Sequence, residues 1–173
     1  MDAIDLHLVT QLQKQADIAL TELSRRLGIS KTTCWNRIQR LEENRVITGK
    51  YTQFSREELG LSVVVFLSIT VGRHSPEWVN RFISVVERFP EIVEAHRLTG
   101  EGADYQLKIV CPDITAYDAF QQKLINEIEF TSMSSKISLK EIKWTHHLPL
   151  AHLEEAGQDR YEVMISIQQS RCL

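Results

Sequence analysis

The sequence predicts an α+β protein with an N-terminal helix-turn-helix and a C-terminal ferredoxin-like βαββαβ domain. Three observations predict this fold. Apolar residues recur at helical spacing up to about residue 44, a β-branched apolar run follows at 61–71, and strand-like and helical patterns then alternate. We expect a helix-turn-helix domain over residues 1–50, a β hinge or linker over 51–60, a ferredoxin-like domain over 61–149 and an extension of unknown role over 150–173.

The first two helices of the N-terminal domain are predicted from spacing and capping residues. An apolar stripe at every fourth position predicts a helix over 4–12, and Asp2 can cap it. A second, short helix is expected over 21–27, with Gly28 ending it because glycine is favoured just after a helix. Residues 46–51 then have the composition of a short strand or wing.

The third helix is expected over 31–44, with Ser30 as its N-cap. One face of this helix carries a stripe that we expect to be buried: Cys34, Ile38 and Leu41. The opposite face is polar, and its side chains are free to contact a partner.

Six elements are expected in the C-terminal domain. They are a strand at 61–71, a helix from Pro76 to about Phe89, strands at 92–99 and 105–110, a helix at about 113–128, and a strand at 132–144. This order gives one antiparallel sheet with two helices on one face. The other face of the sheet must be covered, which favours a homodimer formed through the sheet.

The charge of the chain is distributed unevenly. Residues 1–54 carry eight cations and six acids, whereas the remainder carries twelve cations and seventeen acids. Between Arg25 and Lys50 there are seven cations against two acids. A basic patch on an acidic protein suits a polyanionic partner for that patch only.

Several function classes lack support in the sequence. Cys34, Cys111 and Cys172 are far apart and odd in number, which indicates neither a disulfide framework nor a zinc site. The apolar run at 61–71 is too short to span a bilayer, and Asp2 and Asp5 stand where a signal peptide would be basic. We therefore expect a cytoplasmic protein with no metal, no cofactor and no membrane partner.

The polar face of the third helix has the chemistry of a DNA-reading surface. Threonine and asparagine side chains can bond phosphates or base edges, and lysine and arginine can neutralise phosphates or read guanine. The candidate DNA-binding residues are Ser30, Lys31, Thr32, Thr33, Trp35, Asn36, Arg37 and Arg40. The alternative is an ordinary three-helix packing unit with solvated charges.

Two separate segments resemble the helix-turn-helix of the Lrp/AsnC family of feast/famine regulators. They are Ala19–Ser30 (ALTELSRRLGIS) and Thr33–Glu42 (TCWNRIQRLE), followed by Val46–Gly49 in the place of the strand that comes next in that family. The resemblance continues through Pro112–Tyr117 and covers roughly residues 2–149. It implies a winged helix-turn-helix on double-stranded DNA, joined by a β hinge to a ligand-binding domain whose dimers assemble further, to octamers.

The same family has a Gly-(Asp/Glu)-x-Asp-(Tyr/Phe) motif between its second and third sensor strands. This chain has a similar stretch, Gly100–Tyr105, with one extra residue before Asp104. By resemblance, the candidate effector-binding residues are Leu98, Thr99, Gly100, Glu101, Asp104 and Tyr105. Here a carboxylate could pair with an α-ammonium group and turn amides could hold an α-carboxylate. A plain hairpin turn is the alternative.

The expected function is that of a sequence-specific, DNA-binding transcriptional regulator that responds to an amino acid or a related small metabolite. One alternative is an architectural DNA-binding protein with a metabolite-binding module. Another is a ferredoxin-like-fold enzyme that uses Glu101 and Asp104 as paired carboxylates, although the sequence has no nucleophile, metal motif or phosphate loop beside them.

Overall fold

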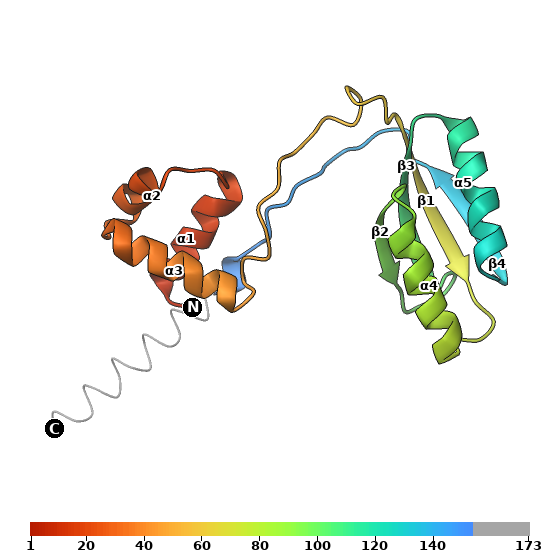
Figure 1. The fold of residues 1–173 in the computed structure, drawn as a ribbon, viewed down its shortest axis with the longest axis horizontal. Coiled ribbons are helices and arrows are strands. Elements are labelled where there is room, and N and C mark those ends of the chain that lie inside the picture. The colour runs from red at the N-terminus through yellow and green to blue at the C-terminus, as the bar shows by residue number, and fades with distance from the viewer. Residues whose placement is uncertain (154–173) are drawn as a thin grey trace. The chain divides into compact units, whose positions relative to one another are not determined.

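A computed structural model describes residues 1–153 of the chain, as two compact units. Residues 1–52 together with 144–153 form a helical unit, and residues 53–143 form a unit built on a sheet (Figure 1). Most of the expected 150–173 extension, and Cys172 with it, lies outside the described residues.

The helical unit contains α1 (Ala3–Lys14), α2 (Leu20–Leu27) and α3 (Lys31–Glu43). Its core is made by one buried residue from each of the first two helices and by the predicted stripe of the third: Leu8, Leu23, Cys34, Ile38 and Leu41. The side-chain amide of Gln13 bonds both the N–H and the carbonyl of Leu148, which ties residues 144–153 to this unit.

The turn between α2 and α3 has the caps that the sequence predicts. Gly28 has φ +66°, a left-handed conformation that glycine adopts without a Cβ clash. The Ile29 N–H donates to the Ser24 carbonyl, and Ser30 Oγ accepts the Thr33 N–H at 3.0 Å. These bonds end one helix and begin the next within three residues, which fixes the direction of α3.

The expected strand or wing at 46–51 is not formed, and neither is a β hinge at 51–60. The N–H groups of Val46 and Ile47 both donate to the Leu41 carbonyl, at 2.8 and 3.1 Å, so they close the end of α3. Backbone donors used in this way cannot join a strand ladder. A turn over residues 56–60 then precedes the sheet.

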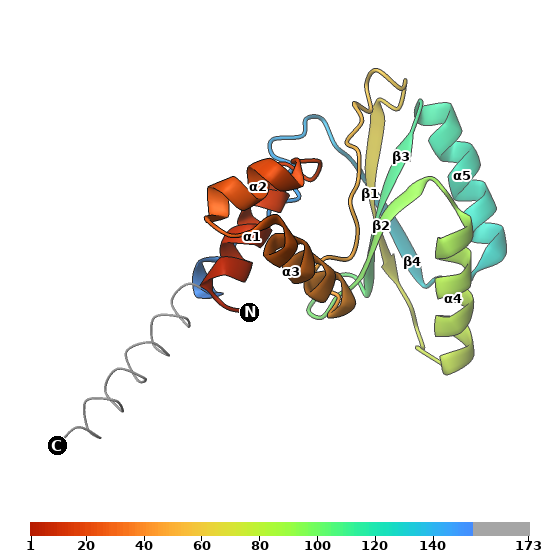
Figure 2. The same cartoon turned by 60° about the vertical axis from the view of Figure 1, so that its left-hand side comes forward.

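The second unit has the predicted element order. It comprises β1 (Val63–Thr70), α4 (Pro76–Arg88), β2 (Ile92–Arg97), β3 (Tyr105–Cys111), α5 (Ile114–Glu127) and β4 (Ser132–Ile137). The strands form one antiparallel sheet in the order β2-β3-β1-β4, the ferredoxin-like arrangement. Both helices lie on the same side of the sheet (Figure 2).

The core of this unit lies between the sheet and its two helices. Alternate residues of β1 face the helices and are fully buried: Val65, Leu67 and Ile69. They pack with Phe82 of α4 and with Phe120 and Leu124 of α5. The residues between them point to the other face of the sheet, where Phe66 is 38% exposed beside Ser68.

The last strand is shorter than predicted, because β4 ends at Ile137 and not at Trp144. Ile137 pairs with Val65, and the Ser138 N–H donates to the Val64 carbonyl. Since β1 begins at Val63, only two of its residues lie beyond Val65 in this register, and the chain after Leu139 has no part of β1 to pair with. Leu139 and Ile142 continue the alternating pattern but are almost fully exposed.

Candidate nucleic-acid interface and effector site

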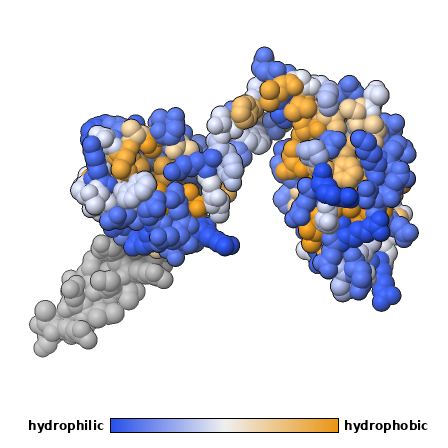
Figure 3. All heavy atoms as spheres, viewed as in Figure 1, coloured by the Kyte–Doolittle hydropathy of each residue, from blue (hydrophilic) through white to orange (hydrophobic). Residues whose placement is uncertain are grey.

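The predicted DNA-reading face of α3 is exposed. Lys31, Thr32, Asn36 and Arg40 are all accessible, and the Trp35 indole is 52% exposed. The visible surface along α3 is mainly hydrophilic in Figure 3. The buried Cys34 stripe turns this face outwards, so the arrangement can present polar side chains to a DNA groove.

Two of the predicted DNA-binding residues already have a structural role. Ser30 Oγ caps α3 through the Thr33 N–H, and it also lies 2.8 Å from Thr33 Oγ1. Each hydroxyl keeps remaining bonding capacity, because a hydroxyl can donate once and accept twice. Both side chains stay exposed at the N-terminus of the helix, the end that meets base edges in a helix-turn-helix.

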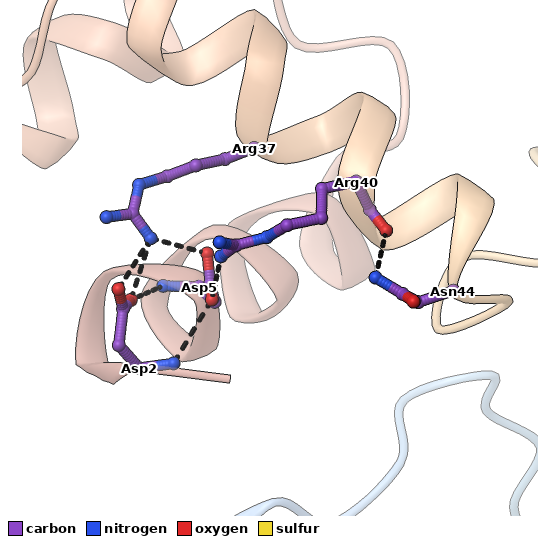
Figure 4. A network of polar contacts seen from close by, with 5 residues as sticks. All are labelled: Asp2, Asp5, Arg37, Arg40 and Asn44. Atoms are coloured by element: carbon purple, nitrogen blue, oxygen red, sulfur yellow. Dashed lines mark hydrogen bonds and ion pairs between the residues drawn. The ribbon is translucent and has the colours of Figure 1, made fainter.

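The two arginines of this face are held by carboxylates of α1 and its cap (Figure 4). Arg37 Nη1 donates to both Asp2 oxygens, at 2.9 and 2.7 Å, and to Asp5 Oδ1 at 2.7 Å. Arg40 Nη2 donates to Asp5 Oδ2 at 2.7 Å. Burial acts to raise the pKa of the Asp2 carboxyl, but hydrogen bonds from the Asp5 N–H and Arg37 outweigh it, and the pKa is lowered.

The basic patch is therefore partly neutralised within the chain. Among the seven cations from Arg25 to Lys50, the five that make ion pairs with carboxylates are Arg25, Arg26, Arg37, Arg40 and Lys50. Within residues 1–153, no carboxylate lies within ion-pair distance of Lys31 or Arg45. The field that this face offers a polyanion is weaker than the residue count indicates.

The predicted effector residues surround the turn between β2 and β3. Leu98, Thr99, Gly100 and Glu101 are exposed, whereas Tyr105 is buried and only 5% accessible. The turn contains two glycines with positive φ, which accommodate the extra residue of this loop. The six residues thus lie together at one end of the sheet, but they differ in exposure: four are exposed, Asp104 is half-buried and Tyr105 is buried.

Asp104 joins this turn to the end of β1. Its Oδ2 accepts the Val71 N–H at 2.7 Å, its own N–H donates to the Ile69 carbonyl, and Leu98 donates to the Asp104 carbonyl. Its Oδ1 lies 3.7 Å from His74 Nε2. One oxygen of this carboxylate is therefore used within the fold, and the other lies beside an imidazole.

His74 is a neighbour of the turn that the sequence did not single out. Its ring lies 5.7 Å from the Tyr105 ring and 6.2 Å from Trp78, and Phe82 stacks on Trp78. Within the described residues, His74 Nε2 and the Tyr105 hydroxyl are buried without a hydrogen-bond partner. No spacing rule links a residue of the β1–α4 loop to the β2–β3 turn, so only the fold shows their proximity.

Comparison with known proteins identifies the family. The AsnC-type helix-turn-helix domain matches residues 1–42, and the Lrp/AsnC ligand binding domain matches residues 64–148. The chain belongs to the Lrp/AsnC family. It is a DNA-binding transcriptional regulator of this type, with a helix-turn-helix and a ligand-binding domain on an α+β fold, as the sequence predicted.

Named relatives of this Lrp/AsnC protein cover most of its length. The glutamate uptake regulatory protein of Zymomonas mobilis is 33% identical over 158 residues, 91% of this chain and 96% of that protein. The leucine-responsive regulatory protein of Escherichia coli is 37% identical over 127 residues, 73% of this chain and 74% of that protein.

Two solved structures support the same fold. An AsnC family transcriptional regulator from Agrobacterium tumefaciens has a TM-score of 0.83 at 41% identity, covering 88% of this chain and 99% of that one. A transcriptional regulator from Neisseria meningitidis, solved as an L-Met complex, has a TM-score of 0.82 at 29% identity over the same shares.

The helices within residues 1–153 are too short or too polar for any of them to cross a bilayer. Residues 1–153 also contain no cluster of three histidine, cysteine or acidic residues suited to a metal ion.

Proposed function

We propose that this Lrp/AsnC regulator reads DNA with the exposed face of α3. The supporting observation is the orientation of that helix, since its buried stripe packs on α1 and α2 and leaves the polar side chains outside. The proposed contact residues are Ser30, Lys31, Thr32, Thr33, Trp35, Asn36, Arg37 and Arg40. Asn36 has the donor and acceptor pair that reads adenine, and Lys31 suits a phosphate.

Gel-shift titrations of the full chain on DNA from its own promoter and on random duplex test this placement. Asn36→Ala should cost about 1–3 kcal/mol on the preferred site and little on random DNA, because it removes a base contact. Lys31→Ala should weaken both complexes alike, because it removes a phosphate contact. Lys14→Ala, on the exposed end of α1, is the control and should change neither. Equal binding of both duplexes by the unmodified protein would overturn sequence-specific reading.

We propose further that the β2–β3 turn binds an amino acid. The relatives named for leucine and for glutamate uptake, and the L-Met complex, indicate this class of ligand. Exposed Glu101 is placed to pair with an α-ammonium group, and the turn amides with an α-carboxylate. The proposed site comprises Leu98, Thr99, Gly100, Glu101, Asp104 and Tyr105.

Thermal-shift screening of the twenty amino acids tests the effector site, because a ligand that binds only the folded state raises its stability. Glu101→Gln should abolish the shift given by the best amino acid while leaving the melting temperature without ligand unchanged. A shift that persists in this variant would place the ligand elsewhere.

The open face of the sheet is the proposed dimer interface, and dimers are proposed to assemble to an octamer. Phe66 is 38% exposed near the centre of this face, on the side of the sheet away from α4 and α5. Phe66→Asp should shift the sedimentation profile to monomer. Ile125→Asp, on an exposed position of α5, is the matched control.

Because the proposed partner of this regulator is DNA, we propose the cytoplasm as the location of the protein. We also propose that the protein acts by binding, without catalysis.

A further inference from the structure

The two arginines of α3 are held by the same buried carboxylate but differ in exposure. Asp5 is 1% exposed and accepts from Arg37 at one oxygen and from Arg40 at the other, both at 2.7 Å (Figure 4). The Arg37 side chain is 21% exposed, whereas that of Arg40 is 54% exposed. One carboxylate therefore anchors an inner and an outer guanidinium.

Arg37 makes its contacts inwards. A single nitrogen, Nη1, serves three carboxylate oxygens of Asp2 and Asp5, and these bonds raise the pKa of the Arg37 guanidinium above its usual value. Contact with a DNA phosphate would draw this nitrogen away from a carboxylate that has almost no access to water. Arg37 thus holds α3 against the N-terminal turn of α1.

Arg40, like Arg37, is held through one nitrogen, but the Arg40 side chain is far more exposed. Its Nη2 bonds Asp5, while its Nε and Nη1 have no hydrogen-bond acceptor within the described residues. A guanidinium is a planar fork with five N–H donors, so fixing one nitrogen also orients the others. Arg40 also lines a surface hollow with Asn44 and Val46, and its remaining donors open towards solvent.

We propose that Asp5 is a positioning residue for DNA binding, which aims the free donors of Arg40 at a phosphate or a guanine edge. Arg37, the less exposed of the two arginines proposed as DNA contacts, ties α3 to α1 through Nη1 and has only its Nε and Nη2 donors left for DNA. This assignment rests on the proposed placement of α3 on DNA. The proposal also predicts the direction in which DNA affinity changes when Asp5 is removed. Removing a negative charge beside a polyanion normally tightens binding, whereas removing Asp5 should weaken it, because Arg40 loses its fixed orientation.

The test is a double-mutant cycle between Asp5→Asn and Arg40→Gln, measured as affinity for promoter DNA over a range of salt concentrations. Arg40→Gln should weaken binding about 10-fold and reduce the slope of log K against log salt by about 1. Asp5→Asn should weaken binding several-fold with the same loss of slope, and should add little in the Arg40→Gln background. Tighter binding by Asp5→Asn, or full additivity of the two changes, would overturn the proposal.

Two controls separate positioning from folding. Asp2→Asn removes a carboxylate of the same network that touches Arg37 but not Arg40, and it should leave affinity equal or higher with the slope unchanged. Equal weakening by Asp2→Asn and Asp5→Asn would contradict a specific role. If Asp5→Asn does not fold, Asp5→Glu keeps the charge and displaces the carboxylate by one methylene. It should weaken binding in the parent protein but not in Arg40→Gln.

The same affinities and salt slopes show whether the role of Asp5 fails alone or the proposed contact of α3 with DNA fails as well. If Arg40→Gln leaves affinity and slope unchanged, Arg40 does not touch DNA, and both the contact and the role of Asp5 are wrong. If Arg40→Gln weakens binding but Asp5→Asn does not, the contact stands and only the positioning role fails.

Discussion

The Asp104 carboxylate accepts the backbone N–H of Val71 at 2.7 Å, which ties the β2–β3 turn to the end of β1. This bond crosses between two loops at one end of the sheet and lies within the proposed effector site. Hydrogen bonds to ionised acceptors are stronger than neutral ones. The carboxylate that the family motif provides therefore has a fold-stabilising role here, whatever it contributes to a ligand.

Asp104→Ala should destabilise the sheet unit by about 1–3 kcal/mol, because it leaves the half-buried Val71 N–H without its acceptor. Urea unfolding of the full chain, followed by circular dichroism, measures the loss. Glu101→Gln is the control, since this neighbouring carboxylate is exposed and makes no hydrogen bond within the described residues. Equal midpoints for Asp104→Ala and the parent protein would show that the bond contributes nothing net.

Ser30→Ala should cost about 1 kcal/mol of helical-unit stability, because the Thr33 N–H loses its cap at the start of α3. The expected readout is faster amide hydrogen exchange in the first turn of α3, with α5 unaffected. Thr32→Ala, on the exposed side of the same turn, is the matched control and should leave exchange unchanged. Protection of the Thr33 amide that survives in Ser30→Ala would contradict the cap.

Local signals predicted α3 correctly, whereas its ion pairs depended on tertiary structure. The Ser30 cap, the Gly28 turn and the spacing of the Cys34 stripe are short-range features, and all are confirmed. The contact between Asp5 and Arg40 joins residues 35 positions apart, and it depends on how α1 crosses α3. Helical periodicity shows which face of a helix is apolar but not which polar residues of two helices meet.

Strand length was predicted less well than strand position for a similar reason. The alternating pattern after Met133 continues past Ile137, but β1 extends only two residues beyond the Val65–Ile137 pair, so a longer β4 would have no neighbour. Likewise, Val46 and Ile47 have β-branched side chains, yet their amides are already bonded to Leu41. A β propensity gives a strand only if a partner backbone is available.

Glu22 should titrate far below an ordinary glutamate. Arg25 and Arg26 both donate to its carboxylate, and these hydrogen bonds lower the pKa of Glu22 from 4.5 to about 2. Because the pKa of Glu22 is lower in the folded state, any stability that its two ion pairs contribute is present above about pH 4.5 and is lost as pH falls towards 2. NMR titration of the Glu22 side-chain carboxyl measures the midpoint directly.

The arginine partners provide the control for that titration. Arg25→Gln removes both hydrogen bonds from Arg25 to Glu22 and should move the Glu22 midpoint back towards 4.5, with Arg26 holding it partly down. Exposed pairs of this kind stabilise proteins little, so the global unfolding midpoint at neutral pH should hardly change. A midpoint near 4.5 in the parent protein would show that the two ion pairs do not persist in solution.

Tyr105→Phe should leave the sheet unit equally stable or make it up to about 1 kcal/mol more stable, because the hydroxyl is buried without a hydrogen-bond partner among residues 1–153. Tyr117→Phe is the opposite case, since the Tyr117 hydroxyl bonds Ser135 Oγ and its removal should cost about 1 kcal/mol. If the Tyr105 hydroxyl serves the proposed effector site, Tyr105→Phe should also weaken amino-acid binding in calorimetry without lowering stability. A loss of stability equal to that of Tyr117→Phe would show that the Tyr105 hydroxyl is bonded in the folded protein, and would remove it from the set of groups available to a ligand.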